Sequence, residues 1–138
     1  MNDQTFDLAS AAERIDGEHI VLHPVTGAAT AARIKLAGPE HDVRRAADNA
    51  RQRAIRAELA NTGKYSPPDP VDSDADATAF AAACTLGWSG LVESGVPITF
   101  EVGAASKLYS DKRYRWLRDQ VLSAMNQREL FFNASASN

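Results

Sequence analysis

The sequence predicts a small, mainly α-helical domain of the α+β class, with a short β-hairpin near its amino terminus. Residues 40–61 and 111–132 carry apolar side chains at helical spacing, which is typical of amphipathic helices. Residues 20–22 are a β-type run, and residues 32–36 alternate apolar with basic side chains. A chain of 138 residues is long enough to bury a core without disulfides or metals. We therefore expect one helical domain that contains one hairpin.

The amino-terminal part divides into an arm and the hairpin. Residues 1–18 are polar and small, and their loosely spaced apolar side chains predict a flexible or weakly helical arm. The single domain is expected to cover residues 19–132, and the hairpin, residues 19–37, begins it. Gly38 and Pro39 then end the second strand, and the proline also suits the first turn of a following helix.

Two helices separated by a proline-rich segment are predicted for the middle of the chain. Alanines recur on one stripe of the first helix, residues 40–61, and this stripe would allow another helix to approach closely. Gly63 supplies the helix stop. Residues 64–72 hold several prolines and are predicted to be a linker or a wrapped loop. The next helix, residues 74–86, is apolar on almost every side and is expected at the centre of the fold.

Residues 87–100 are interpreted as the structural joint of the fold. In this interpretation Gly87 ends the central helix and Trp88 fills the core. Pro97 sets the start of the following helix, which is predicted for residues 100–109.

The carboxy-terminal part is predicted to be one amphipathic helix over residues 111–132, followed by a frayed tail at 133–138. Trp116 on this helix is assigned to the core, because a large aromatic side chain usually fills a gap between packed elements.

Charge and composition argue against several classes of protein. The formal net charge is −3, so no global positive field draws the chain to nucleic acid or to a membrane surface. No apolar run approaches the length of a membrane span, and the amino terminus does not resemble a signal peptide. The single cysteine, Cys84, lies among apolar residues and is expected to be buried and inert. These features predict a soluble protein that stays in the cytoplasm of the cell that makes it.

The sequence provides no recognisable catalytic, cofactor-binding or metal-binding motif. His19, His23 and His41 lack the cysteines or acidic cluster of a zinc site. Residues 62–64 resemble the end of a phosphate-binding loop, but Glu58 stands where that motif needs its first glycine. No nucleophile elbow is present. We therefore expect no enzyme activity, no cofactor and no metal.

A cluster of arginines marks the helix predicted at residues 40–61. Acidic residues are interleaved with the arginines, which favours a solvated or protein-binding face over a nucleic-acid face. Phe131 and Phe132 near the carboxy terminus either bind a partner or close the core of the domain itself. The candidate partner surface consists of Arg45, Arg53, Arg56, Phe131 and Phe132.

Several short segments follow one another in a recognisable order. They are His23-Pro24-Val25-Thr26-Gly27, the run from Ala32 to Pro39, Gly87-Trp88-Ser89-Gly90-Leu91, the loop from Glu93 to Ile98, Ala104, Ala105 and Leu108, Trp116-Leu117-Arg118-Asp119-Gln120-Val121, and Phe131-Phe132. Their order over residues 19–132 resembles the tail assembly chaperones of long-tailed, siphovirus-like bacteriophages. These small proteins are encoded between the tail tube protein and the tape measure protein.

The resemblance implies a non-enzymatic chaperone in the cytoplasm of the bacterial host. Such a protein would bind the tape measure protein and help tail tube subunits to polymerise around it. Self-association is left open. The alternative function is a structural tail or head component that is retained in the virion, and a weaker alternative is a small nucleic-acid-binding regulator.

Overall fold

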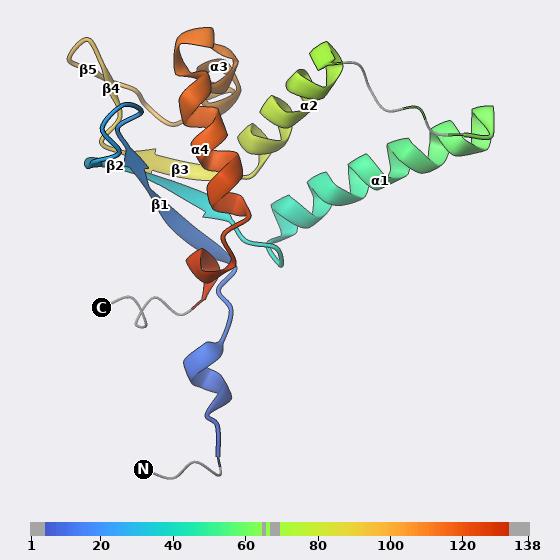
Figure 1. Cartoon of the computed structure of the whole chain (residues 1–138), viewed down its shortest axis with the longest axis horizontal. Coiled ribbons are helices and arrows are strands. Elements are labelled where there is room, and N and C mark those ends of the chain that lie inside the picture. The colour runs from blue at the N-terminus through green and yellow to red at the C-terminus, as the bar shows by residue number, and fades with distance from the viewer. Residues whose placement is uncertain (1–4, 65, 67–69, 133–138) are drawn as a thin grey trace.

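The computed structural model describes residues 5–64, 66 and 70–132 and has an α+β fold. An antiparallel sheet lies beside the carboxy-terminal helices, and a pair of helices extends away from it (Figure 1). The sheet consists of β1 (Asp16–Leu22), β2 (Ala29–Ala37) and β3 (Thr85–Ser89), in the order β1-β2-β3. The expectation of a mixed α+β domain is confirmed.

The central strand β2 organises the core. Ala32, Ile34 and Leu36 alternate along it and are buried, whereas Arg33 and Lys35 point to the other face. The rest of the core comes from β1, from the ends of α2 and β3, and from the carboxy-terminal helices. Its other apolar members are Val21, Ala37, Ala81, Cys84, Ala105, Leu108, Tyr109, Leu117, Val121, Ala124, Met125 and Phe131.

The predicted bounds of the central helix, residues 74–86, are wrong at both ends. The helix in the structure, α2 (Pro70–Ala83), begins inside the predicted linker of residues 64–72, of which residues 65 and 67–69 lie outside the described part. It stops at Ala83 because Thr85 pairs with Leu36 of β2 and so begins a strand. Gly87 therefore does not end a helix, and it lies within β3 opposite Lys35.

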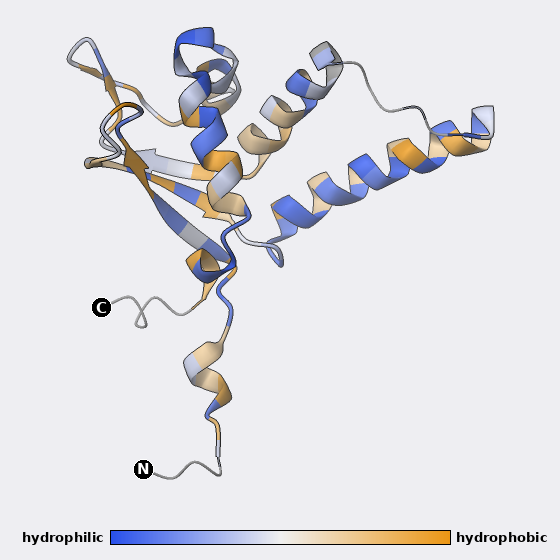
Figure 2. Cartoon of the chain, in the orientation of Figure 1, coloured by the Kyte–Doolittle hydropathy of each residue, from blue (hydrophilic) through white to orange (hydrophobic). Residues whose placement is uncertain are grey.

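The helix α1 (Asp42–Thr62) is close to its predicted range, but none of its residues is buried. The ring of His41 caps its first turn by accepting a hydrogen bond from Val43 N at 3.1 Å. Gly63 ends the helix with a φ of 78°, a left-handed conformation that favours glycine. α1 extends away from the sheet, and hydrophilic and apolar residues alternate along it (Figure 2). The predicted alanine stripe therefore lies mostly in solvent.

A small hairpin forms within residues 87–100, the segment interpreted as the joint of the fold. It pairs β4 (Val92–Glu93) with β5 (Val96–Pro97), so Pro97 belongs to a strand and does not begin a helix. The helix α3 (Ala104–Ser110) begins later than predicted, after Gly103 at a φ of 84°.

The helix predicted at residues 111–132 is divided into three pieces. These are the 3-10 helix η2 (Lys112–Tyr114), the helix α4 (Arg115–Met125) and the 3-10 helix η3 (Arg128–Phe131). Asp111 accepts a hydrogen bond from Arg113 N and caps η2, which separates η2 from α3. The division at residues 126–127 turns Phe131 back onto the sheet, where its side chain is fully buried.

Residues 13–14 meet residues 131–132 at the end of the sheet. The 3-10 helix η1 (Leu8–Ala11) is exposed throughout, but β1 begins at Asp16, inside the arm predicted for residues 1–18. Glu13 forms a β-bridge with Phe132, and Arg14 N donates a hydrogen bond to the carbonyl of Phe131. The predicted tail at 133–138 lies outside the described residues.

Candidate functional site

One side of α1 is fixed to the body of the protein by two arginines. Arg44 donates a hydrogen bond to the Ala37 carbonyl at 3.3 Å, and its guanidinium lies 5.8 Å from the centre of the Phe131 ring. Arg51 lies 4.7 Å from the centre of the Phe80 ring and 3.4 Å from the Asp76 carboxylate. These contacts define which face of α1 is turned toward α2 and the sheet.

The opposite face of α1, here called the outward face, consists of small residues and arginines. Successive helical residues are about 100° apart, which places this face roughly opposite Arg44 and Arg51. All its members are exposed, and Arg53 and Arg56 form no ion pair with any described residue. The outward face comprises Arg45, Ala46, Asn49, Ala50, Arg53, Arg56, Ala57 and Ala60.

The predicted partner surface is thus only partly brought together. Arg45, Arg53 and Arg56 share the outward face, although Arg45 also pairs with Glu40 at 3.2 Å. Phe131 was wrongly placed on this surface, because its side chain fills the core beneath η3. Phe132 is half-buried under Arg128, whose guanidinium lies 5.6 Å from the ring centre.

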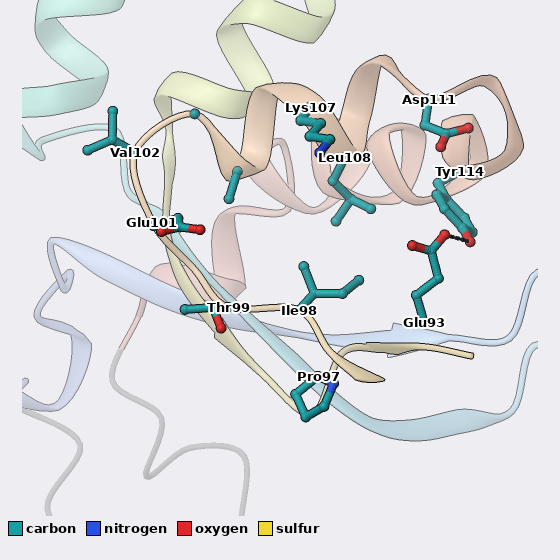
Figure 3. Close-up of a pocket in the computed structure, with 12 residues that line it drawn as sticks. Glu93, Pro97, Ile98, Thr99, Glu101, Val102, Lys107, Leu108, Asp111 and Tyr114 are labelled. Carbon is teal, nitrogen blue, oxygen red and sulfur yellow. Dashed lines mark hydrogen bonds between the residues drawn. The ribbon is translucent and has the colours of Figure 1, made fainter. Parts of the chain in front are cut away.

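A second surface, which the sequence did not reveal, is a groove between the β4–β5 hairpin and α3. Its volume is about 500 Å³, and Ile98 and Leu108 face one another across it (Figure 3). Carboxylates and one lysine stand on its rim. The charged residues that line it are Glu93, Glu101, Lys107 and Asp111.

The groove ends at a projecting turn, here called the 101–103 ridge. Val102 at its top is fully exposed and points away from the groove floor (Figure 3). A second hollow of about 570 Å³ lies between this ridge and the end of α2. Val102 therefore leaves its apolar side chain in water between two hollows.

Hydrogen bonds and aromatic packing hold the groove in shape. Trp88 Nε1 donates a hydrogen bond to the Ile98 carbonyl at 2.8 Å, and the Trp88 and Phe100 rings pack edge to face at 4.8 Å. The structural role predicted for Trp88 therefore consists of holding residues 98–100, and its side chain is half-buried. Trp116 is also half-buried and packs against the core.

Polar contacts tie the hairpin to η2. Tyr114 donates a hydrogen bond from its hydroxyl to Glu93 at 2.5 Å, and this interaction raises the pKa of the phenol. Arg113 bridges Glu93 at 3.3 Å and Asp111 at 2.8 Å. Hydrogen bonds from Arg113 lower the pKa of Asp111, so the rim is negatively charged near neutral pH.

His19 and His23 form hydrogen bonds within the fold, and Cys84 is buried. His19 shares a hydrogen bond of 3.0 Å with Gln120, and His23 accepts one from Val25 N within a turn. Burial raises the pKa of the Cys84 thiol to about 11. Across residues 5–64, 66 and 70–132, no three His, Cys, Asp or Glu side chains form a group that could hold a metal ion.

A sequence signal for the ridge exists in retrospect. Val102 is followed by Gly103, and a glycine at a positive φ can interrupt a helical pattern. The helix predicted for residues 100–109 contains Val102 in its interior, whereas in the structure Val102 precedes the helix and is exposed.

Comparison with protein-family models, curated proteins and solved structures found no significant match to this chain. Within the part of the chain that the structure describes, no helix is both long and apolar enough to cross a membrane.

Proposed function

We propose that this chain is a non-enzymatic tail assembly chaperone of a long-tailed bacteriophage, which binds the tape measure protein and promotes assembly of the tail tube. It acts in the cytoplasm of the bacterial host. The order of sequence features from His23 to Phe132 supports the family, and the exposed helix α1 supports a role in protein binding.

The observation that carries the proposal is that α1 has no buried residue over its 21 positions. Helices in globular proteins gain most of their stability from packing, so a long helix outside the core indicates a second role. Its outward face offers small side chains for close approach and arginines for charged contacts. Such a face suits a helical partner, because helix recognition uses side chains spaced three and four residues apart.

A test is co-expression of this chain with the tape measure and tail tube proteins encoded beside it. The chaperone should increase the soluble yield of the tape measure protein and be recovered with it. Replacing Arg53 and Arg56 together by glutamate should reduce that recovery, because it reverses the charge of the outward face.

The matched control replaces Lys64 and Lys112 by glutamate, which makes the same change of charge at exposed positions outside α1. An unchanged soluble yield of the tape measure protein would contradict the proposal. Stoichiometric amounts of this chain in purified mature virions would instead support a structural component, because a chaperone leaves before the particle is complete.

A further inference from the structure

The 101–103 ridge has the features of one half of a protein contact. Val102 is fully exposed, and Phe100 beside it is exposed over 37% of its surface. The hollows on the two sides of the ridge both include Glu101, Val102 and Gly103 in their walls. A surface that continues across a ridge from one hollow into another fits an elongated partner better than a small molecule.

The outward face of α1 has the complementary shape. Alanines at positions 46, 50 and 57 leave the helix backbone close to the surface, and the long side chains of Arg53 and Arg56 stand beside them. A projecting valine can enter such a depression, as side chains of one element enter the spaces between side chains of another when helices pack.

The charges of the two surfaces are also complementary. Glu101 on the ridge is exposed and forms no ion pair with any described residue, and the same is true of Arg53 and Arg56. Nearby, Glu93 and Asp111 share Arg113, and Lys107 is the one lysine on the groove rim. α1 contains five arginines against three acidic residues, in a chain whose formal net charge is −3. α1 is therefore positive and the rim of the groove negative.

The outward face does not meet the ridge of its own molecule. Arg51 fixes the inner side of α1 to Asp76 and Phe80 of α2, and Arg44 fixes its first turns to Ala37 and Phe131. The outward face is consequently directed away from its own domain.

We infer that α1 of one molecule docks against the 101–103 ridge of a second copy. Val102 of the second copy lies among the alanines of α1, and Glu101 pairs with Arg53 or Arg56. Two different surfaces meet in this contact, so a pair of molecules retains one free α1 and one free ridge. Copies therefore add head to tail, either into a closed ring or into an open chain.

The inference is tested with the purified chain alone, by sedimentation velocity over a range of protein concentrations. The average mass should increase with concentration, with a dissociation constant on the order of micromolar, because alanines bury little area. Sodium chloride should weaken the association, because exposed ion pairs are screened by salt. A mass that stays at one monomer throughout would overturn the inference.

Two variants test the ridge and the outward face of α1 separately. Val102→Gln replaces the projecting valine by a polar side chain without changing the charge of the ridge, and the combined Arg53→Glu and Arg56→Glu variant makes α1 acidic. Each should weaken self-association roughly tenfold or more. Val25→Gln is the control for the ridge, because Val25 is 86% exposed in the β1–β2 turn. The combined Lys64→Glu and Lys112→Glu variant is the control for α1. Circular dichroism checks that all variants remain folded.

Mixing the ridge variant with the α1 variant gives the sharpest result. Each variant retains one intact surface, so the mixture should form a one-to-one dimer that neither forms alone. If the Val102→Gln variant associates as strongly as the unmodified chain, pairing between two α1 helices is indicated and the inference fails. The inference goes beyond the proposed function, although both use the outward face of α1. A monomeric chain that still solubilises the tape measure protein would overturn the inference alone, and Val102→Gln tests the inference without changing that face.

Discussion

Arg118 brings a positive charge into the contact between α2 and α4. Its side chain is 9% exposed, and its Nη1 lies 2.6 Å from the Asp74 carboxylate and 3.2 Å from Thr78 Oγ1. Asp119 accepts a second hydrogen bond at 2.8 Å. Arg115 also contacts Asp74 at 2.8 Å. Removal of one partner from such a network is costly when it leaves a desolvated charge without compensation.

This network predicts a loss of stability in acid. The hydrogen bond from Arg118 lowers the pKa of Asp74 below its ordinary value of 3.8, although partial burial opposes the shift. A carboxyl with a lowered folded-state pKa stabilises the protein above its unfolded-state pKa, and this contribution is lost as the pH falls through the folded-state value. Urea unfolding from about pH 7 to pH 3 should show the free energy of unfolding decreasing below about pH 4.

Asp74→Asn should remove part of the decrease in the free energy of unfolding at acidic pH, because the amide does not titrate. Asp48→Asn, at an exposed position of α1, is the matched control and should leave it unchanged. If the free energy of unfolding of the Asp74→Asn variant depends on pH as that of the unmodified protein does, the Asp74–Arg118 ion pair does not contribute to the loss of stability in acid.

At the scale of elements, α1 and α2 have different reasons to be helical. α2 buries Ala81 completely in the core, whereas α1 buries no residue. The stability of α1 therefore depends on its alanines, its His41 cap and its Gly63 terminus, with support from Arg44 and Arg51.

The same alanine-to-glycine substitution should have different effects in α1 and in α2. Alanine to glycine costs about 1 kcal/mol of intrinsic helix stability. Ala50→Gly should increase amide hydrogen exchange within α1 and leave the midpoint of urea unfolding nearly unchanged, because α1 can fray without opening the core. Ala81→Gly should lower the global free energy of unfolding by about 1–2 kcal/mol, since it also removes a buried methyl group. Equal shifts of the midpoint would mean that α1 unfolds together with the core.

The sheet edge at β1 is protected by a side chain from a distant helix. Gln120 of α4 accepts a hydrogen bond from Leu22 N at 3.0 Å and donates one to the Leu22 carbonyl at 2.7 Å. Its amide thereby takes the place of a neighbouring strand. Edge strands without such cover can pair with other chains, and this contact covers the edge of β1 at Leu22.

At the scale of the whole molecule, η3 closes the end of the sheet where residues 13–14 meet residues 131–132. A Cβ on Gly17 would lie 2.7 Å from the Leu130 carbonyl and 2.9 Å from Phe131 Cδ1. Phe131 can reach the core only because Gly17 lacks a side chain. The exposed η1, in contrast, adds nothing to the core.

Two changes near the chain ends should therefore differ strongly in effect. Deletion of residues 1–12 should leave the melting temperature almost unchanged. Phe131→Ala should lower the free energy of unfolding by about 3–5 kcal/mol, because it leaves a large cavity under the sheet. Phe132→Ala, at a half-buried position, is the matched control and should cost clearly less. Thermal and urea unfolding would measure all three, and a strong loss of stability on deletion would show that the arm packs on the domain.

The sequence by itself determined the elements that depend on residues close to them in the chain. The range of α1 follows from helical periodicity and from Gly63, and the α+β class follows from the combination of β-type runs with amphipathic segments. The burial of Cys84 follows from its apolar neighbours. Each of these signals lies within a few residues of the structure that it predicts.

Only the tertiary structure decided what depends on distant partners. Thr85 begins a strand because β2 offers it a partner nearly 50 residues earlier in the chain, and no local pattern contains that partner. Phe131 is buried because a glycine in β1 makes room for it. The outward direction of the alanines of α1 is set by arginine contacts with α2 and η3, and residues 98–100, which lead into the ridge, are held by Trp88. Periodicity predicts that an apolar face exists, but contacts between distant segments determine what that face meets.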